Sequence, residues 1–137
     1  YYWFPKMFGR MYEKKAAVTG FVLWFVGFMM TYVPLFIAGY LGMPRRYQDY
    51  DGPLLRYEPY HKLSTIGSWI MILGLLVVIY NVIRSIRKGP KTTANPWHGA
   101  TLEWSVASPP PTHQFPEPPV ITHGPYDYEA VPRESEA

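Results

Sequence analysis

The stretch that decides the fold is residues 16–43, which read AAVTGFVLWFVGFMMTYVPLFIAGYLGM and contain no charged side chain. As a helix it would extend about 42 Å, more than the roughly 30 Å hydrocarbon core of a bilayer. The excess indicates tilt, protrusion or a kink, and Pro34 gives a cause for a kink because it lacks a backbone donor. A second uncharged stretch, residues 63–83, would extend about 31 Å. Both are too long and too evenly apolar for a soluble core, so we predict an all-α membrane protein with two transmembrane helices.

The last third of the sequence has a different composition. Ten of the 15 prolines lie from Pro90 onward, which predicts an extended Pro-rich tail rather than a packed helical domain. Residues 1–91 contain 12 Lys and Arg against 4 Asp and Glu, whereas residues 92–137 contain one Arg against 6 acidic residues. A basic membrane part followed by an acidic tail argues against nucleic acid as a partner. The absence of cysteine excludes disulfides, thiolate metal sites and cysteine nucleophiles.

Basic residues cluster before the first apolar stretch and after the second, so both clusters lie on the same side of the membrane. The clusters are Lys6, Arg10, Lys14 and Lys15 before the first stretch, and Arg84, Arg87, Lys88 and Lys91 after the second. The positive-inside rule places this side in the cytoplasm. The predicted division is 1–15 as the end of a preceding helix and a cytoplasmic loop, 16–43 and 63–83 as membrane helices, 44–62 as an outward loop, and 84–137 as a cytoplasmic tail. The aromatic start, Tyr1 rather than Met, is typical of a helix end at the interface, so we expect a longer or processed protein.

Glycines recur at a spacing of seven in both stretches, as Gly20 and Gly27 and as Gly67 and Gly74. Small residues let helix backbones approach closely. We expect these rows to form a seam against further helices of a bundle, and the alternative is glycine of no special role.

The outward loop begins with Arg45 and Arg46, at the end of an apolar helix. A guanidinium is permanently charged, and its planar fork suits carboxylates and phosphates. Charge at this depth is costly unless it is paired, which indicates an anionic ligand. The alternative is that both side chains extend to lipid headgroups.

No other pattern in the sequence indicates catalysis. The histidines lie at 61, 98, 113 and 123, outside both apolar stretches, so imidazoles of this chain cannot ligate a metal within the bilayer. The methionines of the stretches are far more typical of packing than of haem ligation. Nucleotide-binding, hydrolase and zinc-protease motifs are absent, as are carboxylates within the stretches.

Trp97 and Trp104 are unusual in a polar tail and predict an extended strap that docks on a surface of its own complex. The run of three prolines at 109–111 favours polyproline II, and recognition by an SH3-like domain is the alternative.

Four motifs in this order resemble the C-terminal end of subunit I of haem–copper terminal oxidases. They are Phe4-Pro5-Lys6-Met7-Phe8-Gly9-Arg10-Met11, Gly42-Met43-Pro44-Arg45-Arg46-Tyr47-Gln48-Asp49-Tyr50, Asn95-Pro96-Trp97 with Thr101-Leu102-Glu103-Trp104, and Ser108-Pro109-Pro110-Pro111. The resemblance extends from residue 1 to about Phe115, and residues 116–137 match no pattern of that family.

The resemblance implies that the two stretches are the last two of about twelve helices. It implies an enzyme that reduces dioxygen to water and pumps protons, with two haems, low-spin and high-spin, and a copper whose ligands all lie upstream. Arg45 and Arg46 match residues that bind the haem propionates, Tyr32 is expected to contact a haem, and the backbone of Gln48 matches a sodium or calcium ligand. Many relatives have Gln-His after the helix proline where Leu35 and Phe36 stand here, so roles of those polar residues do not carry over.

The resemblance also gives expectations about partners and location. They are the rest of subunit I, subunits of types II and III, the lipid bilayer, and cytochrome c as electron donor, which Pro44 favours over quinol. The expected location is the bacterial cytoplasmic membrane, with the mitochondrial inner membrane as the alternative. Two other interpretations stay open: a separate two-helix subunit that completes such an oxidase, and a two-helix scaffold unrelated to redox chemistry.

Overall fold

The structure, a computed structural model, describes residues 1–115 and 117–131. Its helices are α1 (Phe4–Phe8), α2 (Lys14–Tyr40) and α3 (Glu58–Lys88), with 3-10 helices η1 (Gly52–Tyr57), η2 (Leu102–Ser105) and η3 (Tyr128–Ala130). Among the described residues, the one bridge between extended segments pairs Arg10 with Lys91. The all-α prediction is therefore confirmed, and α2 and α3 are both long and apolar enough to cross a membrane.

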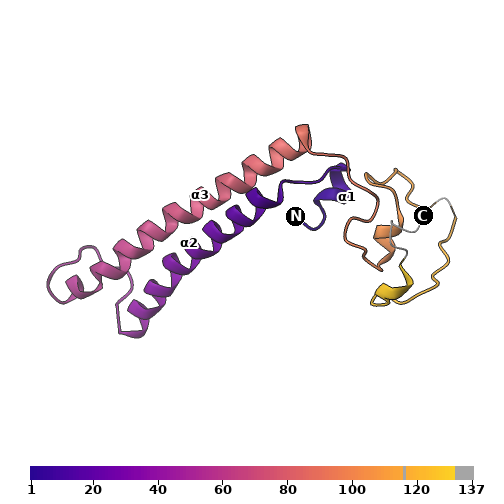
Figure 1. The fold of residues 1–137 in the computed structure, drawn as a ribbon. Coiled ribbons are helices and arrows are strands. Elements are labelled where there is room, and N and C mark those ends of the chain that lie inside the picture. The colour runs from indigo at the N-terminus through magenta and orange to yellow at the C-terminus, as the bar shows by residue number, and fades with distance from the viewer. Residues whose placement is uncertain (116, 132–137) are drawn as a thin grey trace. The chain divides into compact units, whose positions relative to one another are not determined.

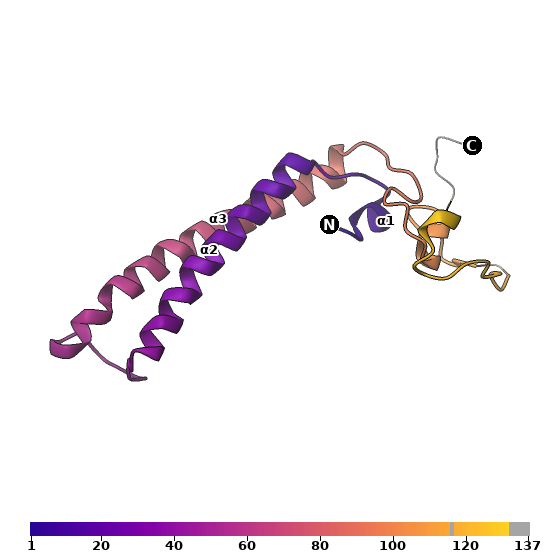
Figure 2. The same cartoon turned by 60° about the horizontal axis from the view of Figure 1, so that its bottom comes forward.

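The chain forms two compact units. One is a helical hairpin, residues Lys14–Asn81, in which α2 and most of α3 lie side by side (Figures 1 and 2). The other joins Tyr1–Glu13 to the residues from Val82 onward.

The two long helices end at other residues than the uncharged stretches do. α2 stops at Tyr40, three residues before the uncharged stretch ends, because Gly42 adopts φ +87° and its N–H returns to the Gly39 carbonyl. α3 begins five residues before its uncharged stretch, with Glu58 in the first turn. It ends five residues after the stretch, with Arg87 and Lys88 in the last turn, so both charge types suit the helix dipole.

The two glycine rows face each other across the hairpin. A Cβ on Gly27 would lie 2.3 Å from the Met71 backbone nitrogen, and a Cβ on Gly74 would lie 2.5 Å from that of Trp24. A Cβ on Gly67 would lie 2.6 Å from the Thr31 nitrogen. The glycine rows therefore do form a seam, but the prediction that further helices are its partner is wrong, because each row packs against the other helix of the hairpin. The close approach of α2 and α3 uses the small residues, and the bulky side chains remain outside.

The outward-facing side chains of the hairpin are large and apolar. On α2 they include Phe21, Trp24, Phe28 and Phe36, and on α3 they include Ile66, Trp69, Leu76 and Tyr80. A helix pair that is apolar on its outer surface requires lipid or further helices around it. This surface agrees with a segment of a larger helical bundle.

The second unit is held by aromatic contacts between its beginning and its end. Trp97 stacks on Tyr2 with ring centroids 6.4 Å apart, and Trp104 stacks on Trp3 at 6.1 Å. Both indole nitrogens donate to Tyr2, from Trp97 to the carbonyl at 3.0 Å and from Trp104 to the hydroxyl at 2.8 Å. The prediction that the tryptophans dock a strap on a surface is confirmed, and residues 1–12 provide that surface.

Candidate functional site

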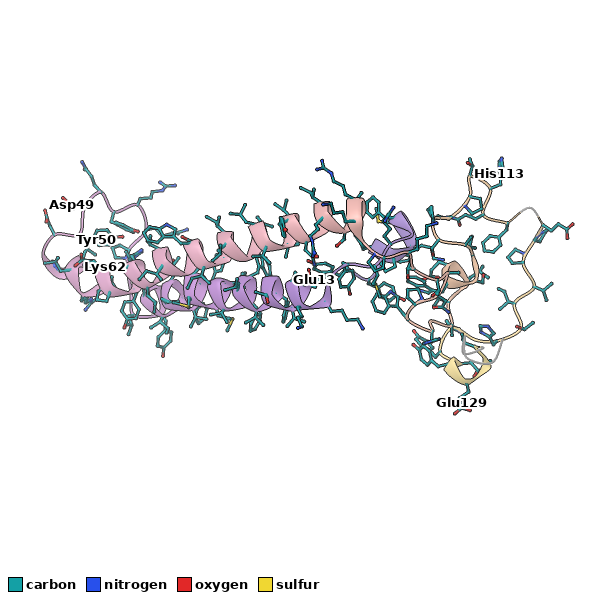
Figure 3. The ribbon with its side chains drawn as sticks, turned by 45° about the horizontal axis from the view of Figure 1, so that its top comes forward. Glu13, Asp49, Tyr50, Lys62, His113 and Glu129 are labelled. Carbon is teal, nitrogen blue, oxygen red and sulfur yellow. The ribbon has the colours of Figure 1, made fainter. Side chains whose placement is uncertain are left out.

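The predicted arginine pair lies in residues 41–51, which we call the arginine loop. It closes the hairpin at the end where Asp49 and Tyr50 of the loop lie near Lys62 of α3 (Figure 3). Arg45 and Arg46 are both exposed. Arg46 has φ +61°, a left-handed backbone that is uncommon outside glycine and costs on the order of 1 kcal/mol. Such a conformation at a non-glycine residue is typical of functional sites.

Tyr57 attaches the arginine loop to the start of α3. Its side chain is 1% exposed, and its hydroxyl donates to the Leu41 carbonyl at 2.8 Å. The same hydroxyl accepts from Arg56, whose guanidinium also lies 4.6 Å from the ring centre. No motif in the sequence points to Tyr57. The available signal was an aromatic residue with a hydrogen-bonding tip just before a membrane helix.

His61 forms a second attachment of the arginine loop. Its Nε2 lies 3.0 Å from the Met43 sulfur, and its ring contacts Tyr47 and Tyr50 with centroids 5.7 and 5.3 Å away. The Tyr50 hydroxyl donates to that of Tyr47 at 3.3 Å. This hydrogen bond is the main cause that raises the pKa of Tyr50 to about 12, and burial is the second. Both ends of the arginine loop are thus tied to α3 or to η1.

No described residue neutralises the two guanidinium groups. Across residues 1–115 and 117–131, neither Arg45 nor Arg46 forms a hydrogen bond or an ion pair. Two adjacent exposed cations with ten N–H donors between them suit a ligand that carries two carboxylates. The residues present therefore fit the propionates of a haem.

Two further predicted site residues lie on the hairpin. Tyr32 is 51% exposed and turned away from the glycine seam, with its ring 4.6 Å from that of Phe28. Trp24 continues this row at 5.8 Å from Phe28, so α2 carries a ladder of aromatic rings on an outer face. Gln48 is exposed in the arginine loop. The described residues contain no group of three His, Asp or Glu that could hold a metal ion.

Lys6 forms a second site, which the sequence analysis had treated only as part of a basic cluster. The side chain is 5% exposed, and Nζ donates to the carbonyls of Ala94 at 3.0 Å and Val106 at 2.5 Å. It lies 5.1 Å from the centre of the Trp104 ring. Burial lowers the pKa of Lys6, and the nearby charge of Glu103 opposes this. Lys6 thus links the beginning of the chain to the backbone at residues 94 and 106, and we call this arrangement the clamp.

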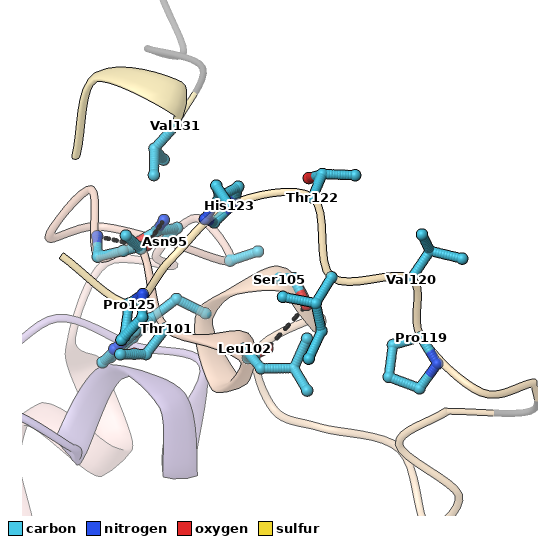
Figure 4. A pocket seen from close by; sticks show the side chains of 15 residues that line it. Asn95, Thr101, Leu102, Ser105, Pro119, Val120, Thr122, His123, Pro125 and Val131 are labelled. Carbon is cyan, nitrogen blue, oxygen red and sulfur yellow. Dashed lines mark hydrogen bonds between the residues drawn. The ribbon is translucent and has the colours of Figure 1, made fainter. Parts of the chain in front are cut away.

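A cavity of about 550 Å³ lies in the tail between residues 94–105 and 119–131 (Figure 4). Its described lining contains no carboxylate, lysine or arginine. The Thr101 hydroxyl is buried there with no hydrogen-bond partner among the described residues. Val120 and Ile121 on its second wall are 86% and 74% exposed. The cavity is separate from the arginine loop in the sequence, and the polar side chains of its described lining are Asn95, Thr101, Ser105, Thr122 and His123.

Comparison with known proteins identifies the family. The family described as "Cytochrome C and Quinol oxidase polypeptide I" matches residues 1–70. Cytochrome c oxidase subunit 1 of Synechocystis sp. is 41% identical over 128 residues, and that of Bacillus subtilis is 38% identical over 122 residues. Ubiquinol oxidase subunit 1 of Acetobacter aceti is 37% identical over 119 residues.

The matches cover 93%, 88% and 83% of this chain, and 23%, 20% and 18% of the three relatives. The chain thus spans about a fifth of the length of the relatives it matches. The coverage of 93% is more than residues 1–115 make up, so the expectation that residues 116–137 match nothing in the family is wrong in part. The match of the family over half of the chain, together with relatives of about 40% identity, agrees with the two apolar helices and the motifs around them. This chain belongs to the family of subunit I of cytochrome c and quinol oxidases.

Proposed function

We propose that this chain forms part of the catalytic subunit of a respiratory terminal oxidase, which reduces dioxygen to water and couples this to proton pumping. The observation that carries the proposal is the unpaired arginine pair at the end of an apolar hairpin. Family membership supports the haem and copper chemistry, and the groups that ligate the metals are expected outside this chain. A bound haem would supply the electron-accepting iron.

In this proposal Arg45 and Arg46 hold the two propionate groups of a haem. Each guanidinium donates a pair of N–H bonds to a carboxylate and offsets its negative charge. Positive charge beside a redox centre favours its reduced form, so the pair raises the reduction potential. Tyr57 and His61 act as positioning residues, because they fix both ends of the arginine loop.

Tyr32 is proposed to contact the haem through the aromatic ladder of α2. Its exposure outside the glycine seam supports this role. For Gln48, we propose that the backbone carbonyl contributes to a sodium or calcium site whose other ligands lie outside this chain. The exposure of Gln48 in the arginine loop is compatible with that role.

A redox titration of the purified oxidase tests the arginine pair. Arg45→Ala and Arg46→Ala should each lower the haem potential by tens of millivolts, since about 1 kcal/mol corresponds to roughly 40 mV for one electron. Electron entry should slow as well. Lys62→Ala is the matched control, because it removes a positive charge beside the same loop from an exposed side chain that pairs with Glu58. An unchanged potential in both arginine variants would rule out the role.

Cytochrome c is the electron donor that we propose, together with partner subunits of types II and III. Pro44 before the arginine pair supports this donor, while the ubiquinol oxidase of Acetobacter aceti makes quinol the competing choice. Steady-state turnover of the purified complex with reduced cytochrome c and, separately, with ubiquinol distinguishes them. We also propose that the complex lies in the bacterial cytoplasmic membrane, with the arginine loop outside and the tail in the cytoplasm.

A further inference from the structure

A small cleft lies within the second unit, between residues 11–13 and the last turns of α3. It has a volume of about 310 Å³ and is bounded by residues 11–13 on one side and 84–90 on the other. Two of its lining side chains are cations, Arg84 and Lys88, and one is a carboxylate, Glu13. The proposed propionate site does not involve this cleft.

Backbone contacts hold the walls of the cleft in place. The Met11 N–H donates to the Pro90 carbonyl at 2.9 Å, and the Arg10 guanidinium donates to the Gly89 carbonyl at 2.7 Å. A Cβ on Gly89 would lie 2.5 Å from the Met11 carbonyl oxygen, so glycine is required for this approach. The cleft is therefore a built feature of the chain and not a gap between loose segments.

Positive charge dominates the cleft. Arg84 and Lys88 are four residues apart, on one face of α3, and both are exposed. Glu13 pairs with Arg84, whereas Lys88 forms no ion pair among residues 1–115 and 117–131. The carbonyls at the end of α3 carry partial negative charge, so any attraction for an anion must come from these side chains. An Arg fork beside a Lys ammonium is a good phosphate ligand.

The cleft follows directly on the apolar part of α3. It begins one residue after the uncharged stretch of α3 ends at Ile83, which is 48% exposed, and Ile86 is exposed as well. Apolar side chains just before the cations give acyl chains a surface to lie on. We propose that this cleft binds the phosphate of an anionic phospholipid, with Lys88 and Arg84 as its ligands and Glu13 as an internal competitor for Arg84.

Native mass spectrometry tests the proposal on the purified complex that carries this chain, reconstituted with phosphatidylcholine and phosphatidylglycerol. Lys88→Gln should weaken retention of phosphatidylglycerol roughly fivefold, the effect of one cation near a membrane surface. Lys91→Gln is the matched control, because the same change is made three residues away at an exposed side chain outside the cleft. Glu13→Gln should strengthen retention, because it releases Arg84.

Three outcomes would overturn the proposal. Equal losses in Lys88→Gln and Lys91→Gln would mean that the attraction is a diffuse surface effect. Weaker retention in Glu13→Gln would mean that the ion pair with Arg84 builds the cleft and does not compete for it. Complete displacement of phosphatidylglycerol by inorganic phosphate would assign the cleft to the free anion instead of a lipid. Hydrogen exchange at α3 checks that each variant remains folded.

Discussion

Replacing Lys6 by Met removes the ammonium from the clamp and keeps the length of the side chain. The native Nζ donates to two carbonyls from a side chain that is 5% exposed. A hydrogen bond to a charged group contributes about 1.5–3 kcal/mol. We take the lower value for each bond, because burying the ammonium is itself costly. The sum is about 3 kcal/mol, which corresponds to a roughly 150-fold rise in the population with the tail released.

Hydrogen exchange on the purified complex measures this release. The amide of Gly99 donates to the Asn95 side chain at 2.8 Å, and that of Trp104 donates to the Thr101 carbonyl at 3.0 Å. Both amides should exchange roughly 150-fold faster in Lys6→Met, provided that exchange follows the open population. Amides of α2 should be unchanged, because the change leaves the hairpin intact.

Lys91→Met serves as the control for the clamp, since Lys91 is an exposed lysine of the same unit. Its exchange should match that of the unchanged protein. A rise of less than about fivefold in Lys6→Met would mean that each bond contributes less than half a kilocalorie per mole, below the usual range. The clamp would then be a consequence of docking by the tryptophans and not its cause.

Three further predictions concern the seam, the pH and the arginine loop. Gly27→Ala should destabilise the complex by about 2 kcal/mol, seen as a lower Tm, because its Cβ meets backbone, whereas Gly39→Ala has nothing within 4 Å and should be neutral. Because burial lowers the pKa of Lys6, docking of the tail releases a proton and should strengthen as pH rises toward 10.5. Amide exchange, corrected for its intrinsic rate, should slow over this pH range in the unchanged protein and not in Lys6→Met. Glu103→Gln removes the charge that opposes this lowering, so the pH range over which docking strengthens should extend to lower pH. Tyr57→Phe should speed exchange in the arginine loop about fivefold, because one buried hydrogen bond is lost; no change would show that the bond does not hold the loop.

The two helices could be predicted from the sequence, because a run of about twenty uncharged apolar residues has few other stable arrangements. Their ends could not, because they depend on caps. Gly42 stops α2 through a left-handed turn, and α3 begins at Glu58, among residues that read as a loop. The rule that predicts a membrane span counts charge and takes no account of capping geometry.

The glycine rows were recognised as a close-packing face, but their partner was predicted wrongly. A spacing of seven gives the face of a helix and says nothing about what it meets. Gly27 and Gly67 meet because the hairpin brings together positions forty residues apart. A row of small residues on each of two neighbouring helices is itself a signal that the two helices pair with each other.

Of the candidate site, the arginine pair could be predicted because two adjacent charges at the end of an apolar helix are anomalous by themselves. The structure adds their exposure and the left-handed backbone of Arg46. Lys6 could not be found in this way, since one lysine in a basic cluster resembles any other. Its acceptors lie 88 and 100 residues away, and no local pattern reports them.

That separation has a consequence for how the protein is made. Lys6 leaves the ribosome long before the carbonyl of Val106, which follows it by 100 residues. At about 5–20 residues per second, the delay is roughly 5–20 s. During that interval both hydrophobic helices are synthesised, while Tyr2 and Trp3 still lack the indoles that later stack on them. The second unit can therefore close only after Val106 has been synthesised. A nascent chain stalled before Trp104 would leave the aromatic surface of residues 1–12 open to chaperones.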